Sequence, residues 1–288
     1  MGVVRVWRSS GKFRVGVVIT TTLIVLALLH QLIIQLVIGD TEPLATGSFA
    51  IFLSPVREHP LGTDRFGRDV LALVLVGLPN SLIVAGIAGV ISTMIGIVVG
   101  FTAGYKGGRI DAALRTFTDM FLVIPTLPLI IILAAYVQQV TIAQLAIILA
   151  VFSWPFAARV IRAQVLSLRE RPYIELSKMT NMSDLEIIVG DILPNMLPYI
   201  GIGFATSALG AAVALVGLEV IGLGPGGSDT MDLGLLINFA QQWGVLSLGK
   251  WAILAAPVTL LVLLFFGVVL INQGLEEFYN PRLRAAEG

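Results

Sequence analysis

The sequence predicts an all-α, polytopic membrane protein, and three observations lead to this prediction. Hydrophobic residues make up 57% of the 288-residue chain and charged residues only 12%, with a mean hydropathy of +0.94. This balance lies outside that of soluble domains. The apolar residues gather in six runs, each long enough to cross a bilayer. Because backbone polar groups must be paired inside hydrocarbon, these runs are predicted to be helices.

The six predicted spans cover residues 15–39, 81–104, 117–137, 142–160, 196–223 and 251–271. A basic segment precedes the first span and also suits a secretory signal peptide. It contains Arg5, Arg8, Lys12 and Arg14. The apolar run is longer than a signal-peptide core, and no small-x-small cleavage motif precedes Asp40. An uncleaved first span is therefore the preferred interpretation.

The distribution of Lys and Arg predicts the orientation. With an even number of spans and an internal N-terminus, 14 basic residues lie inside. The four outside are Arg57, Arg65, Arg68 and Lys250. The positive-inside rule then places both termini in the cytoplasm. We expect residues 1–80 to form a tail, the first span and an external loop, residues 81–273 a core of five helices, and residues 274–288 a cytoplasmic tail.

Residues 163–195 form the largest predicted cytoplasmic loop, between spans four and five. The part of this loop from residue 172 to residue 195 is here called the knuckle. Two short helices are expected in it, one entering after Pro172 and one ending near Pro194. Ser183 and Glu186 match the S-x-x-E capping box, and Asn181 suits the left-handed residue that closes the preceding helix.

The knuckle is predicted to be amphipathic. Apolar residues recur at near-helical spacing, so one face would be buried. They are Leu176, Met179, Met182, Leu185 and Ile188. The other face would carry Glu175, Lys178, Asp184 and Glu186. The pattern alone fits a helix lying on the membrane surface as well as one docked on a protein partner.

Few residues in the chain suit catalysis or cofactor binding. The chain has no cysteine, so disulfides and thiolate sites are excluded, and its net charge of zero does not suggest nucleic acid as a partner. Residues 244–250 resemble a P-loop, but Trp251 replaces the hydroxyl residue that would hold magnesium. Residues 222–227 match G-x-G-x-x-G but follow an apolar helix and contain a proline. We expect no catalytic, cofactor or metal site, and the chain is not expected to be an enzyme.

The knuckle resembles a family signature of Glu-Ala-Ala, a later Gly, and Ile-x-Leu-Pro. The chain has Glu175-Leu176-Ser177, then Asn181, then Ile192-Leu193-Pro194-Asn195, so the alanines and the glycine are replaced. Other matching segments, 59–69, 104–111, Arg115 with Asp119 and Pro125, 154–162, and 274–284, follow in order. The chain thus resembles the inner-membrane permeases of ABC importers, in the C-type subunit of the oligopeptide, dipeptide and nickel branch. Residues 224–230 depart from the family's Pro-rich outer loop.

The resemblance implies a pore-forming subunit in the plasma membrane of a bacterium or archaeon, surrounded by lipid. Its implied partners are a second homologous permease, two ATPases that bind ATP and Mg, and an external substrate-binding protein. Oligopeptide is the first expected cargo, with oligosaccharides or nickel as alternatives. The knuckle would dock in an ATPase groove, with Glu175 as the main contact. The implied docking residues are Tyr173, Glu175, Lys178, Asn181, Ser183, Asp184 and Glu186.

Two other classes of protein fit less well. A stand-alone channel or secondary transporter would show more spans, or inverted repeats with ionisable groups at mid-membrane. The third alternative is an intramembrane enzyme or scaffold. An enzyme would need paired catalytic groups, which this sequence lacks.

A few residues within the spans are also candidates for function. Gly96, Gly100 and Gly104 form two G-x-x-x-G steps and would admit a close neighbouring helix, preferably of this chain, otherwise of the second permease. His30 and Gln31 could form an interhelical hydrogen bond or face a substrate pathway. Glu219 could meet a cationic group of a substrate at the outer mouth.

Overall fold

The computed structural model describes residues 6–7, 9–39, 42–136, 141–180, 182–224 and 230–279. Within these ranges the regular elements are helices, and the isolated β-bridge present there joins Thr63 to Asp69. The predicted all-α class is confirmed.

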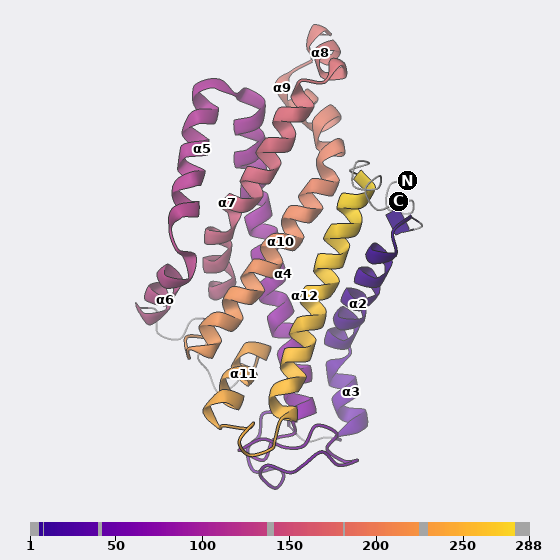
Figure 1. The fold of residues 1–288 in the computed structure, drawn as a ribbon, viewed down its shortest axis with the longest axis vertical. Coiled ribbons are helices and arrows are strands. Elements are labelled where there is room, and N and C mark those ends of the chain that lie inside the picture. Colours follow the sequence, from indigo (N-terminus) through magenta and orange to yellow (C-terminus); the bar gives the residue numbers. More distant parts are fainter. Residues whose placement is uncertain are drawn as a thin grey trace.

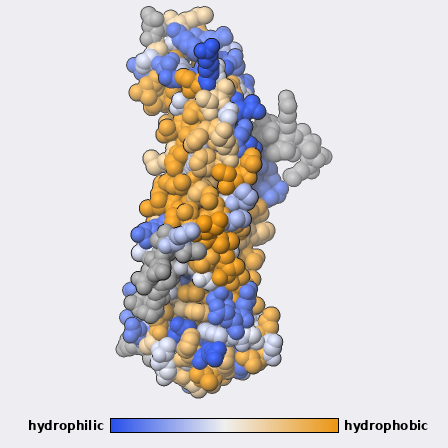
Figure 2. Space-filling view, turned by 90° about the vertical axis from the view of Figure 1, so that its left-hand side faces the viewer, coloured by the Kyte–Doolittle hydropathy of each residue, from blue (hydrophilic) through white to orange (hydrophobic). Residues whose placement is uncertain are grey.

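The long helices lie side by side in an elongated bundle (Figure 1). Over the described residues, five helices are long and apolar enough to cross a membrane, or six if one bent pair is counted as a span. Four of them are α2 (Gly11–Leu28), α4 (Val70–Lys106), α7 (Ile142–Arg169) and α12 (Ala252–Tyr279); the fifth, residues 184–220, ends in α10 (Leu193–Val220). On the face shown in Figure 2, hydrophobic residues cover most of the middle of the bundle, and hydrophilic residues are more frequent toward its two ends. The polytopic membrane architecture is therefore confirmed.

The third predicted span is not one straight helix, and this corrects the expectation for residues 117–137. It consists of α5 (Gly108–Val123) and α6 (Thr126–Tyr136), which are bent by 74° relative to each other. Ile124 between them is extended, with φ −71° and ψ 123°. A residue before proline avoids the helical conformation because of the proline ring, so Pro125 explains the break.

Two further helices begin earlier or bend more than predicted. The first span is α2 followed by α3 (His30–Val37), with a bend at Leu29. Helix α4 starts at Val70, eleven positions before the predicted start at 81, because the Asp69 side chain accepts a hydrogen bond from the amide of Ala72 and caps it. The connection before it is correspondingly shorter than expected.

The cap, residues 42–69 and 230–250, closes the end of the bundle opposite the knuckle. It includes α11 (Leu233–Gln242), a short helix that the sequence reading did not predict. Phe52, Phe66 and Phe239 pack around Trp243, with ring centroids between 5.1 and 6.5 Å from it. The two segments of the cap, far apart in the sequence, therefore form one packed unit.

Candidate functional site: the knuckle

The knuckle begins as predicted, with a short helix, a turn and a capped second helix. Helix α8 (Pro172–Met179) has proline at its first turn, where the missing N–H costs nothing. Ser183 then starts α9 (Asp184–Ile187): its hydroxyl accepts from the amide of Glu186 at 3.3 Å, while the Glu186 carboxylate accepts from the amide of Ser183 at 2.7 Å. The predicted capping box is confirmed. Asn181 lies outside the described residues.

The second helix does not end near Pro194, which corrects that prediction. Helix α9 continues through a π-helical turn, η1 (Ile188–Ile192), into α10. In this wider turn the amide of Leu193 donates to the carbonyl of Ile188, five residues earlier. We attribute the tolerance of Pro194 to this widening, since a proline ring otherwise clashes with the carbonyl four residues before it. The side-chain amide of Asn195 donates to the carbonyl of Asp191 at 2.7 Å.

Apolar side chains fix the base of the knuckle to the bundle. Ile174, Ile187 and Ile192 are fully buried, and they form one cluster with residues of α4, α7 and α10. Those residues are Phe101, Ile161, Val165 and Met196. Burying aliphatic side chains of this size stabilises by roughly 1.5–3 kcal/mol each. The knuckle is therefore held firmly against three membrane-crossing helices.

Polar contacts add to this attachment. The Tyr105 hydroxyl donates to Asp184 at 3.0 Å, and the Ser177 hydroxyl donates to Asp191 at 2.7 Å. The Arg169 guanidinium donates to the carbonyl of Gly104 at 3.0 Å and so joins the ends of α4 and α7. No sequence motif predicts a role for Tyr105, Arg169 or Asp191. Tyr105 and Arg169 lie at helix ends next to the knuckle, and Asp191 lies within it; only these positions could have suggested a role.

The remaining apolar face of the knuckle is uncovered. Leu176, Met179 and Leu185 are 63%, 81% and 70% exposed. The chain itself buries the isoleucines on the opposite side, so the covering of this face by a protein partner or by the membrane surface stays a prediction. Acidic and basic side chains surround the exposed face, and Glu175, Lys178, Asp184 and Glu186 are all accessible. Contiguous exposed apolar residues with a charged rim are typical of a protein interaction site.

Comparison with known proteins identifies the family. Residues 96–285 match the family described as binding-protein-dependent transport system inner membrane component. The chain belongs to this family. It is 33% identical, over 82% of its length and 80% of the relative's, to the oligopeptide transport system permease protein OppC of Mycobacterium tuberculosis (strain H37Rv). It is 30% identical, over 96% of its length and 90% of the relative's, to the probable D,D-dipeptide transport system permease protein DdpC of Escherichia coli (strain K12).

A solved structure shares the fold. The inward-facing MetNI methionine ABC transporter contains a chain that matches this one with a TM-score of 0.53 and 20% identity, over 70% of this chain and 96% of that chain. Because it belongs to the family named above, the chain is a multi-pass inner-membrane permease subunit of a bacterial ABC transporter that depends on a binding protein. Such subunits are not ATPases, and membership implies ATPase and binding-protein partners.

Gly96, Gly100 and Gly104 pack against another helix of the same chain, which is the alternative that was preferred from the sequence. A Cβ added at Gly96 would lie 2.8 Å from Cβ of Ala157, and one at Gly100 would lie 2.8 Å from the carbonyl oxygen of Ala158. A Cβ at Gly104 would meet Val165 at 2.8 Å. The three glycines thus let the C-terminal part of α4 approach α7 closely.

The predicted pathway residues lie outside the knuckle. His30 contacts the carbonyl of Ala27 at 2.7 Å, at the bend between α2 and α3, and with Gln31 it lines a hollow of about 430 Å³. Glu219 is 1% exposed, beneath Gly224 and Gly234, and its Oε1 has no hydrogen-bond partner. In this conformation the Glu219 carboxylate does not reach the surface. Its role toward a substrate stays a prediction.

Proposed function

We propose that this permease pairs with a second homologous permease to form a pore, and that two ATPase subunits drive peptides through it. An external binding protein delivers the peptides. ATP and Mg²⁺ bind to the ATPase subunits and not to this chain. The uncovered apolar face of the knuckle is the single observation that carries this proposal.

The knuckle can act as a rigid lever because of how it is attached. Its exposed side offers apolar side chains with a charged rim, and its opposite side is buried against α4, α7 and α10. When a protein bound to the exposed side changes its position, the ends of these helices must therefore shift with it. Closure of an ATPase pair on ATP would tilt the spans in this way.

Peptide is the cargo that the relatives favour. The relatives named above are permeases of oligopeptide and D,D-dipeptide transport systems. They lend no support to the oligosaccharide or nickel alternatives. The orientation with both termini in the cytoplasm is part of this proposal, since it places the knuckle on the side where ATP is available.

The test uses charge reversal on the exposed face. The permease carrying Glu175→Arg is purified with its partners from native membranes, and the control carries Glu276→Arg on α12, where the glutamate is also exposed. We expect Glu175→Arg to lower ATPase recovery and peptide-stimulated ATP hydrolysis about tenfold or more, equivalent to about 1.4 kcal/mol of binding. The second permease should still co-purify.

Two results would contradict the proposal. One is full ATPase recovery by both Glu175→Arg and Met179→Asp, which would assign the knuckle to the membrane surface instead. The other is purification of the unaltered chain alone, without a second permease or ATPases, which would favour a stand-alone channel.

A further inference from the structure

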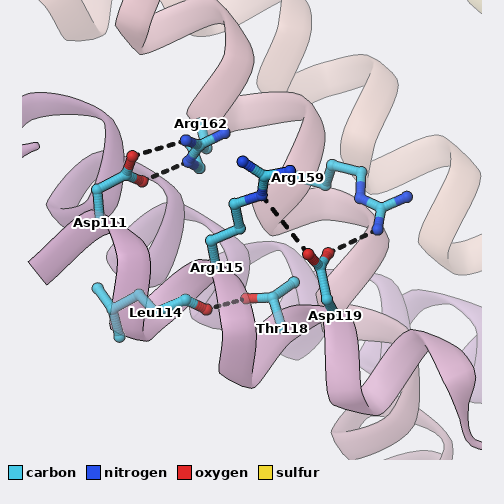
Figure 3. Close-up of polar contacts among 7 residues, drawn as sticks. All are labelled: Asp111, Leu114, Arg115, Thr118, Asp119, Arg159 and Arg162. Carbon is cyan, nitrogen blue, oxygen red and sulfur yellow. Dashed lines mark hydrogen bonds and ion pairs between the residues drawn. The ribbon is translucent and has the colours of Figure 1, made fainter. Parts of the chain in front are cut away.

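Away from the knuckle, a charged cleft lies between α4, α5 and α7. It encloses about 410 Å³ and is lined by Arg115, Asp119, Arg159 and Arg162 together with small and apolar residues of α4. Figure 3 shows these side chains reaching toward one another from the facing sides of α5 and α7. The proposed function uses none of these four residues.

Positive charge exceeds negative charge in this cluster. Arg162 forms a two-bond ion pair with Asp111, and its Nη2 lies 2.7 Å from Oδ2. The Asp119 carboxylate forms ion pairs with two guanidinium groups. Arg159 donates to it at 2.7 Å, and the guanidinium of Arg115 lies 3.6 Å from it (Figure 3). Three guanidinium groups therefore share two carboxylates. The Arg115 and Arg159 side chains are 65% and 58% exposed, which leaves donors of both accessible to a ligand.

The cleft lies at a boundary between charged and apolar surface. No residue is charged between Asp119 and the end of α6. The same holds between the start of α7 and Arg159. Arg159 lies about 15 Å along the helix from the end of α7. Helix α4, with 37 residues, is about 55 Å long, more than the about 40–45 Å of a bilayer with its headgroups. The ends of the helix therefore project beyond the bilayer. This places the cleft, which lies near one end of α4, at the level of the lipid headgroups.

An apolar hollow continues the cleft toward the membrane interior. It encloses about 370 Å³ between α5, α6, α7 and α10. Leu122 and Phe156 line it, and each lies one turn from a residue of the charged cleft, Asp119 on α5 and Arg159 on α7. A basic compartment with an apolar one directly beyond it suits an amphipathic anion.

We propose that this cleft binds the phosphate headgroup of an anionic phospholipid, with an acyl chain entering the apolar hollow. Arg115 and Arg159 hold the phosphate, because the planar guanidinium donates two parallel hydrogen bonds to phosphate oxygens. Basic pockets between membrane helices on the cytoplasmic side are suited to such headgroups. The lipid would belong to the cytoplasmic leaflet, given the orientation predicted from the Lys and Arg distribution. The proposal does not depend on which cargo the transporter carries.

The test measures lipid retention by the intact transporter. The complex is equilibrated in mixed micelles of phosphatidylglycerol and phosphatidylcholine, and the lipids that remain bound are counted by native mass spectrometry. We expect a preference for phosphatidylglycerol that falls about fivefold for each of Arg115→Gln and Arg159→Gln. Arg109→Gln removes an exposed arginine from the first turn of the same helix, outside the cleft, and should leave the preference unchanged.

An opposite change guards against effects of misfolding. Asp119→Asn frees both guanidinium groups from their shared carboxylate and should raise phosphatidylglycerol retention, which a damaged fold would not do. Equal retention of the two lipids by the unaltered complex, or an equal loss in Arg109→Gln, would overturn the proposal. Displacement of the bound phosphatidylglycerol by an acidic peptide would also overturn it, since the cleft would then belong to the transport pathway.

Discussion

The two ends of the bundle, the cap and the knuckle, differ in how they hold their charged groups. In the cap, His59 contacts Asp69 at 2.7 Å and the Arg68 side chain donates to Asp64 at 2.7 Å, and all four residues are buried. In the knuckle, polar groups are accessible and several apolar side chains remain uncovered. The cap also exposes apolar side chains, among them Ile51 and Leu246, but it pairs its buried charged groups internally. The knuckle instead leaves its charged groups accessible beside its uncovered apolar face.

This difference indicates what each end contributes. Removing one partner of a buried charge pair destabilises a protein strongly, because the other charge stays buried without a partner. We therefore expect substitutions of the paired residues in the cap to lower the stability of the chain most. An open end contributes little stability through its exposed face, because that face has no partner within the chain. Substitutions at the two ends should therefore separate stability from coupling to the ATPase.

The largest loss of stability is expected at the cap. Asp64→Ala removes the partner of a buried guanidinium and also the acceptor for the amides of Phe66 and Arg68. Breaking a buried ion pair in this way costs about 3–5 kcal/mol. The free energy of unfolding in detergent measures it. Glu58→Ala, which removes an exposed carboxylate from the same loop, should change it by less than about 0.5 kcal/mol. A similar small effect of Asp64→Ala would contradict the comparison.

A smaller loss is expected in the α4–α7 contact that connects the two ends. Gly100→Ala places a Cβ 2.8 Å from the backbone oxygen of Ala158, and we expect a destabilisation of about 1–3 kcal/mol by overpacking. Gly86→Ala on the same helix meets no atom within 4 Å and should stabilise by about 0.5–1 kcal/mol. Thermal unfolding of both variants tests the opposite signs. A stabilising Gly100→Ala would show that the helices separate at no cost.

The sequence predicted the parts of the fold that depend on local pattern. Long apolar runs located the spans, and the capping box at Ser183 located the start of α9, because both signals lie within a few residues. Helix α11 was missed because its burial depends on packing against α4, α10 and α12, which no local pattern reveals. The bend at Pro125 was missed because hydrophobicity alone continues through the proline.

The sequence predicted the capped second helix of the knuckle but not which of its sides packs on the bundle. The spacing of Leu176, Met179 and Leu185 correctly indicated one apolar face. A second apolar set, which includes Ile174 and Ile187, was passed over, and this set is the one that packs on the bundle. Periodicity shows that a helix has an apolar side, but which of two apolar sides faces the chain depends on neighbours that are distant in sequence.

The smallest change in stability is expected on the exposed face of the knuckle itself. Leu185→Ala removes a side chain that has little contact with its own chain and keeps a strong helix former, so the free energy of unfolding should change by less than about 0.5 kcal/mol. Ile187→Ala, two positions along the same turn, removes a fully buried side chain and should cost about 2–5 kcal/mol. Unfolding of the isolated subunit and ATP hydrolysis by the complex are measured for both. Leu185→Ala should lower peptide-stimulated hydrolysis although the subunit stays stable, because the contact it removes belongs to the partner. If Leu185→Ala destabilises the isolated subunit as much as Ile187→Ala, the face is covered by its own chain and the knuckle is as closed as the cap.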